Sequence, residues 1–98
     1  MNTSIYHEAK DDIVRVPYAL IEDETLSSRA KFIFILILAM KDDEPNMGKL
    51  PKLSGLNHGT VLKYLKELEI AGWIERKTIR DERKRIAGVE YVIHYEKA

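Results

Sequence analysis

The sequence has no cysteine, no net charge and no long apolar run. Without cysteine the chain cannot form disulfide frameworks, thiolate zinc sites or cysteine nucleophiles, and this composition fits the reducing cytoplasm. The longest apolar run, residues 32–40, has nine residues, whereas a membrane-spanning helix needs roughly 20. Residues 1–10 are polar and mixed in charge, unlike a signal peptide. We therefore expect a cytoplasmic protein without a membrane span.

Catalytic and metal-binding motifs are also missing. The sequence contains no glycine-rich phosphate loop, paired-carboxylate motif or serine–histidine arrangement. The three histidines, His7, His58 and His94, are far apart and do not have the spacing of metal ligands. We therefore expect neither an enzyme nor a protein that requires a metal or another cofactor.

The 98 residues leave room for one domain, and 45% of them are hydrophobic, an ordinary fraction for a globular fold. Residues 1–12 show no hydrophobic periodicity. We predict a flexible N-terminal arm at residues 1–12 and a single domain over residues 13–98.

The two halves of the chain carry opposite charges. Residues 1–48 contain five Lys or Arg and nine Asp or Glu, a net charge of −4. Residues 49–98 contain eleven Lys or Arg and seven Asp or Glu, a net charge of +4. This division predicts one acidic and one basic face, and a basic face is where a phosphate backbone would bind.

The first half predicts one strand and one helix. Residues 13–16 (IVRV) are a β-branched run in front of Pro17, which predicts a short strand at the edge of a small sheet. Residues 28–40 are apolar on almost every side and too long for an ordinary strand, so we predict a central helix with a serine cap. The acidic residues and turn formers at 42–46 should end this helix.

Two further helices are predicted at residues 50–56 and 57–71. Pro51 fits a first helical turn, Asn57 can cap the second helix, and Gly72 can stop it. The second helix has an apolar stripe at helical spacing, which should face the core and consists of Val61, Leu65 and Leu68.

The end of the chain predicts a β-hairpin. Residues 73–80 and 87–95 alternate in polarity like strands, and the polar residues 81–85 form the tip between them. The complete prediction is an α+β fold of about three helices with a C-terminal hairpin and a short N-terminal edge strand.

Residues 50–77 (LPKLSGLNHGTVLKYLKELEIAGWIERK) resemble the helix-turn-helix and wing of bacterial winged-helix regulators. The matching residues are Leu53, Gly55, Leu56, Thr60, Val61, Leu65, Leu68, Ala71, Gly72, Trp73, Ile74, Glu75 and Arg76. Residues 13–40 are similar to the front half of winged-helix domains at the N-termini of phage and plasmid replication initiators and DnaD-like replisome organisers.

This resemblance implies a winged helix-turn-helix fold that binds double-stranded DNA, as a transcriptional regulator or a replication-initiation domain. A recognition helix at about residues 57–71 would enter the major groove, and a basic wing at about 77–86 would follow the backbone or the minor groove. The expected DNA-binding residues are Asn57, His58, Gly59, Thr60, Lys63, Tyr64, Lys77, Arg80, Arg83, Lys84 and Arg85. We expect a homodimer that uses the helix at 28–40 and the strand at 13–16 to place two copies on two half-sites.

Several of these residues also fit other roles. A charged hairpin tip is often only solvated, His58 suits any exposed surface, and Tyr64 can pack against the scaffold. Leu62 falls on the groove-facing side of the helix, where it would contact a thymine methyl or belong to a protein interface. The alternative interpretation is therefore a winged helix used for protein association, as the oligomerisation module of a replisome organiser or as an adaptor.

Overall fold

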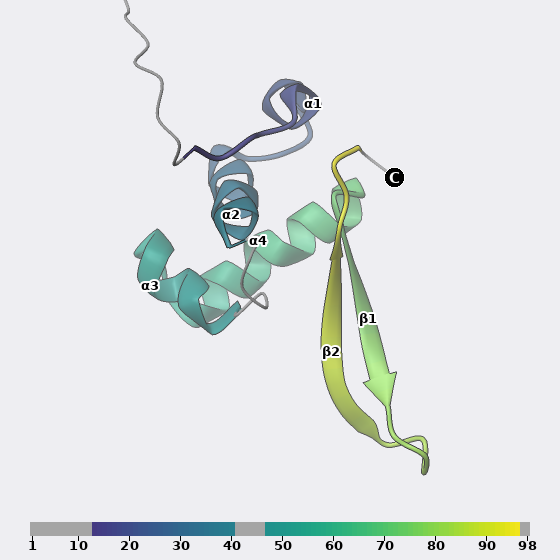
Figure 1. Ribbon diagram of the computed structural model, residues 1–98. Coiled ribbons are helices and arrows are strands. Elements are labelled where there is room, and N and C mark those ends of the chain that lie inside the picture. The colour runs from purple at the N-terminus through teal and green to yellow at the C-terminus, as the bar shows by residue number, and fades with distance from the viewer. Residues whose placement is uncertain (1–12, 41–46, 97–98) are drawn as a thin grey trace, which may run out of the picture.

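The computed structural model describes residues 13–40 and 47–96 (Figure 1). Its elements are α1 (Tyr18–Glu22), α2 (Ser28–Ala39), the 3-10 turn η1 (Met47–Lys49), α3 (Leu50–Ser54), α4 (His58–Ala71), β1 (Ile74–Arg80) and β2 (Ile86–Ile93). Within these residues the protein is α+β, with four α-helices and one antiparallel hairpin. The predicted α+β class is confirmed, whereas the predicted arm at 1–12 and turn at 42–46 lie outside the described residues.

The predicted edge strand at residues 13–16 is wrong. These residues belong to no strand, and the sheet in the described part of the chain consists of β1 and β2 alone. Pro17 instead precedes α1 in an extended conformation and serves as its N-cap. β-branched residues favour strands only where a sheet offers a half-buried place, and here β1 and β2 pair with each other at the far end of the chain. The added helix brings the number of α-helices to four rather than about three.

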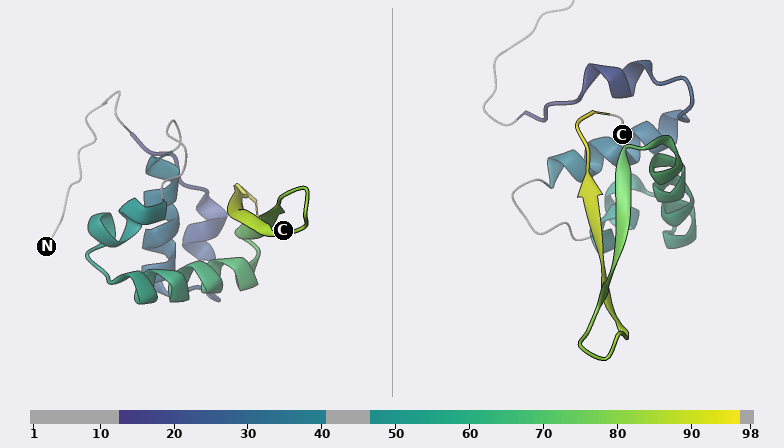
Figure 2. Two further views of the ribbon diagram at one scale, coloured as in Figure 1. Left: turned by 90° about the horizontal axis from the view of Figure 1, so that it is seen from below. Right: turned by 90° about the vertical axis from the view of Figure 1, so that its right-hand side faces the viewer.

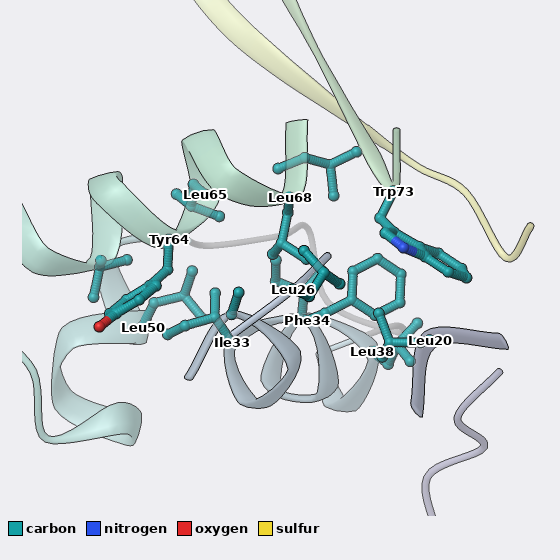
Figure 3. Packing of buried hydrophobic residues seen from close by; sticks show 14 of the residues in the cluster. Leu20, Leu26, Ile33, Phe34, Leu38, Leu50, Tyr64, Leu65, Leu68 and Trp73 are labelled. Atoms are coloured by element: carbon teal, nitrogen blue, oxygen red, sulfur yellow. The ribbon is translucent and has the colours of Figure 1, made fainter. Parts of the chain in front are cut away.

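α2 lies at the centre of the helical body, by which we mean α1 to α4 (Figure 1). The Ser27 Oγ accepts a hydrogen bond from the Ala30 N–H and caps the helix, as the sequence predicts, although α2 ends one residue early, at Ala39. Its buried residues are Ala30, Ile33, Phe34, Ile37 and Leu38, and around them pack Leu20, Leu26, Met40, Leu50, Val61, Tyr64, Leu65, Leu68, Trp73 and Ile74. These residues form one continuous core, shown in part in Figure 3.

Trp73 closes this core where the helices meet the hairpin (Figure 3). Its side chain is fully buried, and its ring meets the Phe34 ring edge-on, with centroids 5.6 Å apart. The indole Nε1–H donates a hydrogen bond to the Asp23 carboxylate over 2.8 Å. Because Asp23 follows α1 directly, this bond ties the first helix to the base of the hairpin.

Glu67 fixes the position of α4 against α2. One carboxylate oxygen accepts a hydrogen bond from the Ser27 N–H over 2.6 Å, and the other accepts one from the Ser27 hydroxyl over 2.9 Å. A carboxylate that accepts hydrogen bonds from two donors at the start of a neighbouring helix fixes the rotation of its own helix about its axis. It also fixes the distance between the two helices at that point. The outward face of α4 is therefore set by a specific contact as well as by the core.

The hairpin projects from the helical body with little support. β1 pairs with β2 from Ile74 opposite Ile93 to Arg80 opposite Ile86, and the register shifts between Ile79 and Arg80. Ile74 is the one buried residue of β1, and β2 has no fully buried residue. The tip of the hairpin and α1 lie at opposite ends of the molecule in Figure 1 and in the right-hand view of Figure 2.

None of the helices among the described residues is long and apolar enough to cross a membrane.

Candidate nucleic-acid interface

The candidate site begins at the N-terminus of α4. The Asn57 Oδ1 accepts a hydrogen bond from the Thr60 N–H over 2.8 Å, which is the predicted cap. Gly72 ends the helix in the left-handed conformation with φ 89°, where the absence of a Cβ removes the steric cost. These two local signals define a helix whose first turn is exposed at His58 and Gly59 and half-buried at Thr60.

The predicted apolar stripe orients α4 as expected. Val61, Leu65 and Leu68 are buried against the rest of the core, so the opposite face of the helix is turned to solvent. Lys63 is exposed on that face. Four of the expected contact residues, Asn57, His58, Gly59 and Lys63, are exposed at the first two turns, whereas Thr60 is half-buried.

Tyr64 does not belong to this surface. Its side chain is only 8% exposed, and in Figure 3 its ring lies beside Leu50 and Ile33 in the core. The sequence placed it on the open side of the helix, and that placement is wrong. Tyr64 follows Val61 by three residues and precedes Leu68 by four, so it shares the buried stripe. Its link to the candidate surface is indirect, because the Lys63 Nζ lies 5.7 Å from the centre of its ring.

α4 and the hairpin form the two arms of an L, since the hairpin extends from the C-terminal end of α4 (Figure 1). The inner corner of the L holds a shallow groove of about 280 Å³, lined by Leu62, Leu65, Lys66, Glu69, Arg76 and Tyr91. Arg76 and Tyr91 face each other across the hairpin. The groove therefore combines apolar side chains with cations from both arms and with the Glu69 carboxylate.

Lys66 and Arg76 are candidate contact residues that the sequence analysis missed. Lys66 lies one helical turn after Leu62 on the same side of α4, and helical spacing alone would have indicated it. Arg76 reaches the groove only because the hairpin leaves the body beside α4, which no local pattern predicts. Lys66 also lies 3.6 Å from Glu69, an exposed pair that screens part of its charge.

The far arm of the L carries the predicted basic residues. Lys77, Arg80, Arg83, Lys84 and Arg85 are all exposed. The tip also contains the acidic residues Asp81 and Glu82, and the Arg85 Nε lies 3.2 Å from the Asp81 carboxylate. The cluster is therefore net positive but partly neutralised within itself.

Three acidic residues of the first half lie away from the hairpin tip. Glu22 ends α1, and Asp23 and Glu24 follow it, at the end of the molecule away from the hairpin tip (Figures 1 and 2). An anionic ligand on the L therefore avoids this acidic segment.

The described residues contain no candidate metal site. In residues 13–40 and 47–96, no group of three or more His, Cys, Asp or Glu side chains is placed to hold a metal ion.

No protein-family model, curated protein or solved structure matches the chain. The binding properties of the surface therefore depend on its own geometry and charge.

Proposed function

We propose that this protein is a winged helix-turn-helix DNA-binding protein that places α4 in the major groove of a duplex and uses the hairpin as a basic wing. The observation that carries the proposal is the L itself. One arm is a helix with its stripe buried and its first turns exposed, and the other is a projecting hairpin with a basic tip.

The exposed start of α4 has the groups that duplex recognition needs. The N-terminus of a helix offers backbone N–H groups and a positive dipole end to phosphate oxygens. His58, Thr60 and Lys63 can donate to base edges in the major groove, where each base pair has a distinct pattern. The buried stripe and the Glu67 contact hold these groups at a fixed angle.

The hairpin supplies the sequence-independent part of the binding. Its basic residues extend the positive surface beyond α4, so that phosphates beside the recognised base pairs can be neutralised. The setting we propose is transcription regulation or replication initiation in the cytoplasm, of the kind carried by phages or plasmids. Two copies would bind two half-sites about one helical turn apart.

Binding of the purified chain to a random pool of labelled duplexes, followed by fluorescence anisotropy at 50 and 200 mM salt and by selection, tests this proposal. We expect affinity to fall steeply with salt, because released counterions drive binding, and we expect a motif to be enriched. Absence of binding at the lower salt concentration would refute the proposal.

Lys63→Ala tests the assignment of the recognition helix. We expect it to weaken binding to the selected site by roughly tenfold and binding to random DNA by less, since contact with a base edge contributes about 1–3 kcal/mol. Arg29→Ala is the matched control, because Arg29 is an exposed cation in the first turn of α2 and belongs to neither arm of the L. Equal losses in the two variants would mean that α4 does not read the sequence.

A second candidate function is protein association, and Leu62 is the observation that favours it. Leu62 is 46% exposed at the inner corner of the L, beside Tyr91. A groove that combines an exposed leucine and a tyrosine with two cations suits a partner that presents apolar and acidic side chains. Leu62→Gln separates the two functions, since it should weaken self-association or partner binding while random-DNA affinity and its salt dependence remain unchanged.

A further inference from the structure

The hairpin tip is held in one conformation by its own hydrogen bonds. The Lys84 N–H donates to the Asp81 carbonyl, and the Asp81 N–H donates to the Arg85 carbonyl, each over 2.9 Å. The Asp81 Oδ1 accepts from the N–H groups of Arg83 and Arg85, also over 2.9 Å each. Four bonds within five residues make this turn preformed rather than adaptable.

One residue of this turn has an unfavourable backbone conformation. Lys84 has φ 62°, and it is the one non-glycine residue with positive φ in residues 13–40 and 47–96. A hairpin loop that continues a turn with a left-handed residue normally carries glycine or asparagine there, because a side chain crowds the backbone. The hydrogen bonds of the turn require a left-handed residue here, and lysine at this position lowers the stability of the hairpin relative to glycine.

The cations of the tip have two different environments. Arg85 forms an ion pair with Asp81, and the Arg80 Nη1 donates to the Lys84 carbonyl over 3.0 Å. Both side chains are therefore engaged in supporting the turn. Among the described residues, no hydrogen bond or ion pair engages the side chain of Lys84 or of Arg83.

We infer that Lys84 is a phosphate-contact residue that is kept in a strained backbone conformation for its charge, and that Asp81, Arg80 and Arg85 are positioning residues that hold it. A side chain that is kept where glycine would avoid strain points to a function of that side chain. The ligand class is the phosphodiester backbone, because an ammonium group is a compact point charge without base-reading geometry. This inference rests on the proposed DNA-binding function. It separates Lys84, as a contact residue, from Arg80 and Arg85, as supports, whereas the sequence treats the basic residues of the hairpin alike.

Lys84→Gly is the decisive variant, measured by two readouts on the full chain. Glycine relieves the strain, so we expect hydrogen exchange of the Asp81 amide, followed by NMR, to slow by roughly fivefold. The same variant should bind random 30-base-pair duplex more weakly, with the slope of log affinity against log salt reduced by about 0.9, the value for one phosphate contact. A turn that becomes more stable while binding becomes weaker is not expected from a merely structural residue.

Two further variants keep the result interpretable. Lys84→Arg retains the charge and the strain, so slope and exchange should both remain at the wild-type values. Arg85→Lys retains the charge but removes the Nε–H that contacts Asp81, so the exchange of the tip amides should become faster.

Specific outcomes overturn the inference. If Lys84→Gly leaves the exchange unchanged, Lys84 is not strained, and if it leaves the salt slope unchanged, Lys84 does not contact phosphate. If Arg85→Lys leaves the exchange of the tip amides unchanged, Arg85 does not support the turn. In each of these cases the wild-type chain still binds duplex with a steep salt dependence, whereas failure of the proposed function itself appears as no binding by the wild-type chain.

Discussion

The helical body is stabilised by a buried core, whereas the hairpin has almost none. In the body, side chains from four helices and from Trp73 share one core, and Phe34, Ile33 and Leu68 have no exposed surface. In the hairpin, apolar side chains remain in contact with water, and Ile86 is 67% exposed. A two-stranded hairpin in water is at best marginally stable by itself.

This difference indicates what each region contributes. Burial of large side chains provides nearly all of the free energy that keeps the chain folded. The hairpin adds little to this and is anchored at its base, where the His94 N–H donates to the Trp73 carbonyl over 3.0 Å. Its sequence is therefore free to be selected for contacts with a ligand, which agrees with the concentration of positive charge at its tip.

The largest expected contrast comes from deleting an apolar side chain in each region. Phe34→Ala should lower the free energy of unfolding by about 3–5 kcal/mol, because it leaves a cavity in the core and removes the contact with Trp73. Ile86→Ala should lower it by less than about 0.5 kcal/mol, because the side chain is already in water. Urea denaturation followed by far-ultraviolet circular dichroism measures both values, and comparable losses would abolish the distinction between the regions.

A smaller contrast is expected from deleting one carboxylate in each region. Glu67→Ala should cost about 1–2 kcal/mol in global stability, because two donors at the start of α2 lose their partner. Asp81→Ala removes three hydrogen bonds, yet they lie within the tip, so the global stability should change by less than about 0.5 kcal/mol. Glu69→Ala is the control on α4, where the exposed pair with Lys66 contributes little. A global loss for Asp81→Ala as large as that for Glu67→Ala would show that the tip unfolds together with the body.

The smallest effect is expected at Gly59, in the first turn of α4. A Cβ at this position would meet the Asn57 Oδ1 at 3.5 Å, an ordinary contact, so alanine fits. Gly59→Ala should raise the free energy of unfolding by up to about 1 kcal/mol through helix propensity. If backbone groups there approach phosphate closely, duplex affinity should fall in the same variant. Unchanged affinity with increased stability would remove Gly59 from the contact surface.

The parts of the fold that depend on neighbouring residues were predictable from the sequence. Asn57 and Gly72 mark the ends of α4 by local hydrogen bonding and backbone conformation, and the stripe beginning at Val61 sets its rotation. The serine cap of α2 follows the same logic.

The parts that depend on distant residues were not predictable. Whether residues 13–16 form a strand depends on a partner strand, and none lies beside them in the described residues. The contribution of Arg76 to the groove depends on the direction in which the hairpin leaves α4. Tyr64 is a different case, because its place three residues after Val61 already puts it beside the buried stripe, and the core uses its ring.

Trp73 is the single tryptophan of the chain, and its place in the fold makes it a built-in optical probe. Its indole lies against Phe34, is hydrogen-bonded to Asp23 and stands at the base of the hairpin, so its emission reports on whether the helices are closed around it. The basic tip lies at the other end of the strands and should be invisible to it. Tryptophan fluorescence therefore follows the opening of the helical body without interference from motion at the tip. A fluorescent label placed beyond residue 80 would instead report on the motion of the hairpin tip.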